Sequence, residues 1–142
     1  MRHPEAAIQR AIAAYLAKVL PDDAWFTAIA HGVRLNGEDS WIRGAISKGM
    51  GTKPGVPDMV VLYQGRAFWG EVKSPKGSLT GAQRYARDVL TAAGCAVAVW
   101  RSIDDVRASL AEWGIPTRET KPATERIKRG LAAAIARESE RA

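Results

Sequence analysis

Two short runs of β-branched and aromatic residues, joined by a turn that contains glycine, constrain the fold of this chain most strongly. Residues 59–63 and 67–72 are rich in these residue types, and the tripeptide Gln64-Gly65-Arg66 lies between them. Branched and aromatic side chains suit the pleated surface of a strand, and glycine suits the positive φ of a tight turn. The stretch is therefore predicted to form a β-hairpin.

The length of the hairpin loop decides which side chains face one another. If the loop has two residues, counting back along both strands puts Asp58 opposite Glu71. Side chains alternate along a strand, so Lys73 shares a face with Glu71. A three-residue loop would put Asp58 opposite Val72 and leave it a diagonal neighbour of Glu71. In either register two carboxylates and an amine converge.

Two opposed carboxylates need positive charge nearby. Their Cβ atoms would lie about 5 Å apart, where two negative charges repel by roughly 3 kcal/mol at an effective dielectric constant near 20. Lys73 is one source of compensation, and a hard divalent cation such as Mg²⁺, which binds carboxylates while it keeps several waters, is another. The non-functional interpretation is an exposed salt bridge of Lys73, worth about 0.2 to 1 kcal/mol.

The chain after the hairpin predicts a helix followed by a strand. Thr80 can cap a helix that runs to about residue 93, with Gly94 as its C-terminal stop. Residues 95–100 then form a predicted buried strand. A strand, helix and strand in this order connect with right-handed topology, so the second strand should lie parallel to the strand of Glu71.

This ordered set of residues resembles a known family. Pro57-Asp58, Glu71-Val72-Lys73 and Gln83 follow the pattern of the PD-(D/E)XK nucleases, specifically the VRR-NUC family, whose G-x-P-D element corresponds to residues 55–58. Its N-terminal helix with an acid and a glutamine resembles the segment of Glu5 and Gln9. The resemblance spans about residues 4 to 113. It implies a restriction endonuclease-like α/β core, in which helices flank a mixed central sheet made of the hairpin and the crossover.

The resemblance also implies a role for each matching residue. Asp58, Glu71 and the backbone carbonyl of Val72 would bind Mg²⁺, with Mn²⁺ able to substitute, in an enzyme that hydrolyses phosphodiester bonds in DNA. Lys73 would orient water and stabilise the anionic transition state. The substrates would be branched DNA such as Holliday junctions or flaps, cleaved by a homodimer, because two symmetric cuts need two sites.

Two residues of the resemblance have equally good structural explanations. Gln83 would join the catalytic set, but it also follows Thr80 by three residues, which is the spacing of a capping box. Glu5 is a further candidate metal ligand, but an acid in the first turn also stabilises a helix dipole.

Charge favours a polyanionic partner. The 142 residues carry a formal net charge of +6 with a pI near 9.8, which makes nucleic acid the first candidate. Trp41, in the glycine-rich segment 32–55, either stacks on an unpaired base or anchors a surface loop. His31 has no second ligand nearby and is interpreted as structural or solvated, with contact to a phosphate as the alternative. The candidate phosphate-binding residues are Arg34, Arg43, Lys48, Lys53 and Lys76.

The single cysteine bounds the setting of the chain. Cys95 excludes an intramolecular disulfide and a cysteine-based zinc site, and neither a signal peptide nor a long apolar span is evident. We therefore expect a cytoplasmic protein of bacterial or phage type with no membrane partner.

The remaining elements flank this core. We predict an amphipathic helix from Pro4 that stops before Pro21, a strand over 24–31 and a helix over 102–113. Residues 1–116 would form the nuclease-like domain, and residues 117–142 a linker and a charged helix. The apolar stripe of that helix must pack on its own domain or on a second subunit. It comprises Ile127, Leu131 and Ile135.

Two rival functions stay open at this point. A non-catalytic nucleic-acid-binding module, or an accessory subunit of a repair or packaging complex, would bind DNA with steep salt dependence but yield no metal-dependent products. A site-specific restriction endonuclease is disfavoured mildly, because no separate recognition domain is evident.

Overall fold

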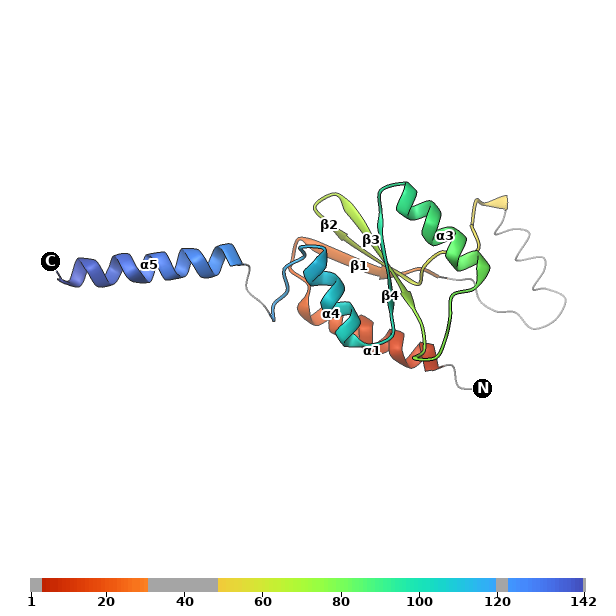
Figure 1. Cartoon of the computed structure of the whole chain (residues 1–142), viewed down its shortest axis with the longest axis horizontal. Helices are drawn as coiled ribbons and strands as arrows, with labels where there is room; N and C mark the ends of the chain where they lie inside the picture. The colour runs from red at the N-terminus through yellow and green to blue at the C-terminus, as the bar shows by residue number, and fades with distance from the viewer. Residues whose placement is uncertain (1–3, 31–48, 120–122, 142) are drawn as a thin grey trace.

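A four-stranded mixed sheet in the order β1-β2-β3-β4 organises the fold (Figure 1). The computed structural model describes residues 4–30, 49–119 and 123–141, with the side chains of 123–129 left out. The elements are α1 (Pro4–Val19), β1 (Ala24–Ala28), β2 (Met59–Tyr63), β3 (Arg66–Val72), α3 (Gly81–Ala92), β4 (Ala96–Trp100), α4 (Ile103–Glu112) and α5 (Ala123–Arg141). This arrangement confirms the predicted mixed α/β core with an extra C-terminal helix.

The hairpin has the two-residue loop that fixes the site. Tyr63 pairs with Arg66 in the antiparallel ladder of β2 and β3. Gln64 and Gly65 between them have φ angles of 49° and 74°, and a turn with positive φ at both central residues matches the twist of the strands that it joins. The three-residue loop is therefore excluded.

The crossover from β3 through α3 to β4 is also as predicted. β4 runs parallel to β3, and the ladder extends one step further through the N–H of Lys73, which donates to the carbonyl of Trp100 at 3.0 Å. Thr80 caps α3, and Gly94 ends it with a φ of 93°. β4 is less buried than predicted: Trp100 is buried, and the other four residues are half-buried. The reason is that β4 is an edge strand of the sheet and that α3 buries none of its own side chains.

The hydrophobic core lies on the opposite face of the sheet, under α1 and α4. These two helices pack against each other and against β3 and β4 respectively. Phe68 and Trp113 place their ring centroids 5.0 Å apart, and Trp100 packs so tightly over Gly70 that an added Cβ would come within 2.1 Å of its ring. Burial of α1 is by Ile12, Tyr15, Leu16 and Val19, as its helical spacing predicts.

The strand predicted over 24–31 is shorter than expected. β1 ends at Ala28, and the next residue, Ile29, donates its N–H to the carbonyl of Asp58 at 2.8 Å. Backbone hydrogen bonding between the two segments therefore continues one step past β1, as far as Asp58, which carries the first candidate carboxylate. His31 lies outside the described residues.

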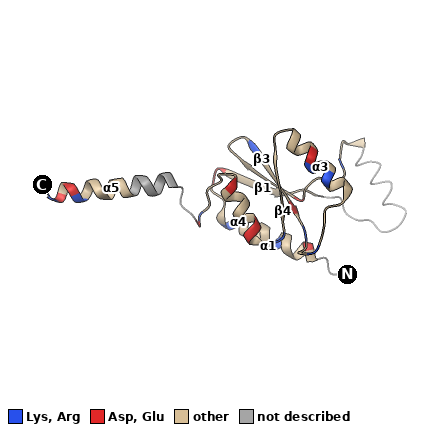
Figure 2. Ribbon diagram, viewed as in Figure 1, with Lys and Arg blue, Asp and Glu red and all other residues tan. Residues whose placement is uncertain are grey.

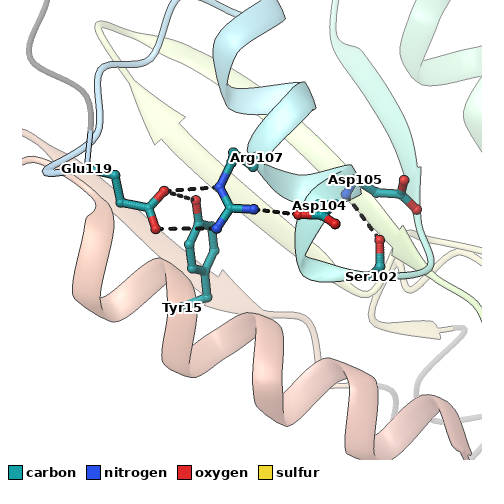
Figure 3. A network of polar contacts seen from close by, with 6 residues as sticks. All are labelled: Tyr15, Ser102, Asp104, Asp105, Arg107 and Glu119. Carbon is teal, nitrogen blue, oxygen red and sulfur yellow. Dashed lines mark hydrogen bonds and ion pairs between the residues drawn. The ribbon is translucent and has the colours of Figure 1, made fainter.

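A polar network fixes the chain just before α5 (Figure 3). Glu119 accepts hydrogen bonds from the hydroxyl of Tyr15 in α1 at 2.8 Å and from Nε of Arg107 in α4 at 3.1 Å. Arg107 in turn lowers the pKa of Glu119. The N–H of Arg118 donates to the carbonyl of Val19 at 2.8 Å. Residues 118 and 119, which the sequence assigned to the linker, are thus tied to the core helices.

The last helix, α5, stands apart from the sheet in Figure 1. Every side chain described in it, from residue 130 to residue 141, is exposed, and Leu131 and Ile135 each expose 60% of their surface. Figure 2 shows basic and acidic residues interspersed along its C-terminal end. Among the described helices, none is long and apolar enough to cross a membrane.

Candidate functional site

Asp58 reaches across the end of the hairpin to β3. The antiparallel register ends with Met59 opposite Gly70, so the next pair outward is Asp58 and Glu71. Oδ2 of Asp58 accepts a hydrogen bond from the N–H of Val72 at 2.8 Å. This bond fixes the Asp58 carboxylate against the backbone beside Glu71.

Glu71 is a buried carboxyl group with one oxygen unpaired. Its side chain exposes 4% of its surface, and Oε2 is buried without a hydrogen-bond partner. Burial, with the negative charge of Asp58 as the second cause, raises the pKa of Glu71 from 4.5 to about 8. Lys73 opposes this rise and Glu5 adds slightly to it. The carboxylate form of Glu71 is therefore short of positive charge.

Gln83 connects the site to the first turn of α3. Its Oε1 accepts from the N–H of Thr80 at 2.9 Å, and its own N–H donates to the Thr80 hydroxyl at 3.2 Å, which is a complete capping box. Its Nε2 donates to Oε1 of Glu71 at 2.8 Å. The capping role and the place beside the carboxylates, which the sequence left as alternatives, therefore hold together in one side chain.

The glycine of the G-x-P-D element holds the loop before Asp58 against α3. Gly55 has a φ of 75°, and an added Cβ would lie 2.2 Å from the carbonyl oxygen of Ala82 and 2.7 Å from the backbone nitrogen of Gln83. Only a residue without a side chain permits this approach. Gly55 thus sets the distance between the Asp58 loop and the helix turn that carries Gln83.

Lys73 is buried at the end of β3, with 7% of its surface exposed. The loop that follows it is clamped by Arg101, whose Nη1 donates to the carbonyls of Ser74 and Gly77, each at 2.6 Å. Sequence reasoning missed Arg101, since nothing in the local pattern marks a residue whose partners lie 24 and 27 positions earlier. The clamp positions the backbone directly after Lys73.

Glu5 lies near the site without completing a set of ligands. Its Oε1 is 3.5 Å from the point where a Cβ on Gly77 would stand, and its charge acts on Glu71. Within the described residues, no group of three or more His, Cys, Asp and Glu side chains could hold a metal ion. Glu5 as a metal ligand stays a prediction.

The residues present nevertheless fit Mg²⁺. Mg²⁺ commonly binds through one or two carboxylates and keeps several waters, so Asp58 and Glu71 suffice as side-chain ligands. The unpaired Oε2 of Glu71 offers a buried oxygen, and a cation would offset the repulsion that raises its pKa. The carbonyl of Val72 stays a predicted further ligand.

Two of the five candidate phosphate-binding residues lie within the described part of the chain. Lys53 and Lys76 are exposed, whereas Arg34, Arg43 and Lys48 lie outside the described residues, as does Trp41. Lys53 stands at the rim of a groove on the α3 side of the sheet.

Comparison with solved structures places this fold. A structure described as "VRR_NUC domain protein" aligns with a TM-score of 0.62 and 19% sequence identity, and the alignment covers 79% of this chain and 88% of that chain. The chain has the fold of a VRR_NUC domain. At this identity the likeness speaks for the fold alone. Protein-family models and curated proteins gave no match.

Proposed function

We propose that the chain is a metal-dependent endonuclease that hydrolyses phosphodiester bonds in DNA. The observation that carries the proposal is the pairing of Asp58 with a buried Glu71 that keeps one oxygen unpaired and a raised pKa. Two carboxylates held this closely are unfavourable unless a cation or a proton joins them. A divalent cation serves this purpose and phosphodiester hydrolysis equally.

In this proposal Asp58, Glu71 and the carbonyl of Val72 hold Mg²⁺, for which Mn²⁺ substitutes. The chemistry that the ion supplies is a polarised scissile phosphate and a bound water of lowered pKa. The protein's own contribution is orientation. The N–H of Val72 fixes Asp58, and the amide of Gln83 fixes Glu71. Rigid carboxylates keep the cation at one position relative to the substrate.

Lys73 supplies the positive charge for the phosphate. It lies at the same end of β3 as Glu71, close enough to lower the pKa of that carboxyl group. An ammonium group there stabilises the negative charge that develops on the phosphate and orients the attacking water. Burial of Lys73 limits its motion, so less reorganisation accompanies the reaction.

The substrate that we propose is branched DNA, such as a Holliday junction or a flap, cleaved by a homodimer. The net charge of +6 supports a polyanionic substrate. The exposed apolar residues of α5, Leu131 and Ile135, supply a surface on which a second subunit could pack.

The test is a cleavage panel over linear, nicked, flapped and four-way DNA, with Mg²⁺ or Mn²⁺ titrated from zero. Asp58→Ala, Glu71→Ala and Lys73→Ala should each lower the cleavage rate by at least about 100-fold. Glu112→Ala, which removes an exposed acid from α4 on the other face of the sheet, should retain full activity. Full activity of Glu71→Ala would reject the proposal. Binding without metal-dependent products would identify a non-catalytic DNA-binding module instead.

A further inference from the structure

An apolar groove lies beside the candidate site, between α3 and the sheet. It encloses about 490 Å³, and its lining includes Lys53, Val56, Trp69, Tyr85, Val89 and Leu90. Tyr85 and Val89 expose 73% and 48% of their surface, which is unusual for large apolar residues along one helix face. Because α3 covers the sheet thinly here, the groove has room for a ligand.

The groove adjoins the carboxylates through two elements. Trp69 precedes Glu71 by two residues in β3, so both side chains leave the same face of the strand, about 7 Å apart. Ala86, which lines the groove, follows Gln83 by three residues, so the two lie on one face of α3, and Gln83 is bonded to Glu71. A ligand in the groove would therefore lie next to a phosphate at the site.

The chemistry of the walls favours a nucleobase over an aliphatic side chain. Trp69 and Tyr85 offer aromatic surface for stacking, which every base can use. Trp69 lines the groove while its Nε1 is buried without a hydrogen-bond partner, so this residue offers the groove its ring and not its N–H. Lys53 at the rim is exposed and matches the phosphate that accompanies each base.

We propose that this groove binds one unstacked base of a single-stranded DNA segment next to the scissile phosphate. The inference rests on the proposed function, because it assigns the phosphate beside the base to the carboxylate site. It deepens that function by naming the feature that is recognised: a base free of its duplex partner, as at a flap or a junction. Fully paired DNA offers no such base to the groove.

Equilibrium binding without divalent metal tests the groove separately from cleavage. The probes are a fluorescent oligothymidine strand, the same strand with one abasic position, and a blunt duplex. Stacking contributes about 1 to 3 kcal/mol per base, so Tyr85→Ala should weaken oligothymidine binding by about 5- to 150-fold. Tyr85→Phe should bind like the wild type.

Trp25→Ala is the matched control. Trp25 is an aromatic residue that is 59% exposed on β1 and lines a different hollow. The Trp25→Ala protein should bind oligothymidine like the wild type. Neither Tyr85→Ala nor Trp25→Ala should change the affinity for the duplex by more than twofold. The wild type should bind the abasic strand more weakly than the intact strand. With the abasic strand, the wild type and Tyr85→Ala should have equal affinities.

Three results would overturn the inference. The first is equal oligothymidine binding by the wild type and Tyr85→Ala. The second is an equal loss of oligothymidine affinity in Tyr85→Ala and Trp25→Ala. The third is a change of subunit number in Tyr85→Ala, measured by light scattering, which would assign the groove to a protein partner. Base-dependent binding without any cleavage would reject the nuclease and leave the groove standing. Cleavage with binding that does not depend on the base would reject the groove and leave the nuclease standing.

Discussion

Replacing Glu71 with glutamine should stabilise the metal-free protein at alkaline pH. Burial and the charge of Asp58 raise the pKa of the Glu71 carboxyl group to about 8 in the folded protein, from an ordinary value of 4.5. Between these values the folded state keeps a proton that the unfolded state has lost. The free energy of unfolding of the wild type should therefore fall as pH rises from about 4.5 to about 8 and then level off.

The difference between the two pKa values sets the size of the effect. It corresponds to at most about 5 kcal/mol, and relaxation around the charged group should leave on the order of 2 kcal/mol. Glutamine keeps the shape of the side chain. Its carbonyl can accept from Gln83, and its NH₂ group can donate to Asp58, where a carboxylate only repels. The variant should therefore lack this loss of stability.

Urea unfolding followed by tryptophan fluorescence at pH 5, 7 and 8.5 in a chelator measures the effect. The difference between Glu71→Gln and wild type isolates this one group, because the other titrating groups are common to both proteins. Glu112→Gln, at an exposed acid, controls for the loss of one negative charge. Adding Mg²⁺ at pH 8.5 should stabilise the wild type by mass action and leave Glu71→Gln almost unchanged. A stability difference that is the same at all three pH values would refute the reasoning.

Further predictions concern the supports of the site and the role of α5. Gly55→Ala should cost at least about 2 kcal/mol of stability and most of the activity, because strain at positive φ adds to a clash with Ala82. Gly65→Ala has a similar φ of 74° and open space around it, so chemical denaturation should show a cost of only about 1 kcal/mol and unchanged cleavage. Thr80→Ala removes only the helix cap, whereas Gln83→Ala also removes the hydrogen bond to Glu71. Both variants should lose about 1 kcal/mol of stability, but only Gln83→Ala should lower the cleavage rate. Equal cleavage rates would show that the glutamine serves the helix alone. A chain that ends at residue 119 keeps the polar network around Glu119. It should fold but not form the proposed dimer, as measured by light scattering, and a dimer of this shortened chain would place the subunit contact outside α5.

The sequence predicts those parts of the site that local rules govern. The turn chemistry at Gln64 and Gly65 decides the hairpin register, and alternation along the strands then places the carboxylates. The same holds for the cap at Thr80 and the parallel crossover, which follow from spacing and handedness.

Contacts between distant segments escape such rules. Arg101 clamps the loop after Lys73, and Gly55 touches the first turn of α3, but neither residue carries a local signal of its partner. The burial of β4 was overestimated for a related reason. The sequence of an apolar strand does not show how closely its second face is covered. In β4 that cover depends on the packing of α3.

The two-residue turn of the hairpin divides the molecule into a part that tolerates changes of length and a part that does not. Gln64 and Gly65 are exposed and lie about 20 Å along the strand from Asp58. An insertion between them lengthens a surface loop and leaves the ladder in place. One residue inserted within β2 or β3 instead moves a carboxylate to the opposite face, unless a bulge absorbs it. The turn is therefore the natural attachment point for a fluorophore or an affinity tag on an otherwise intact protein.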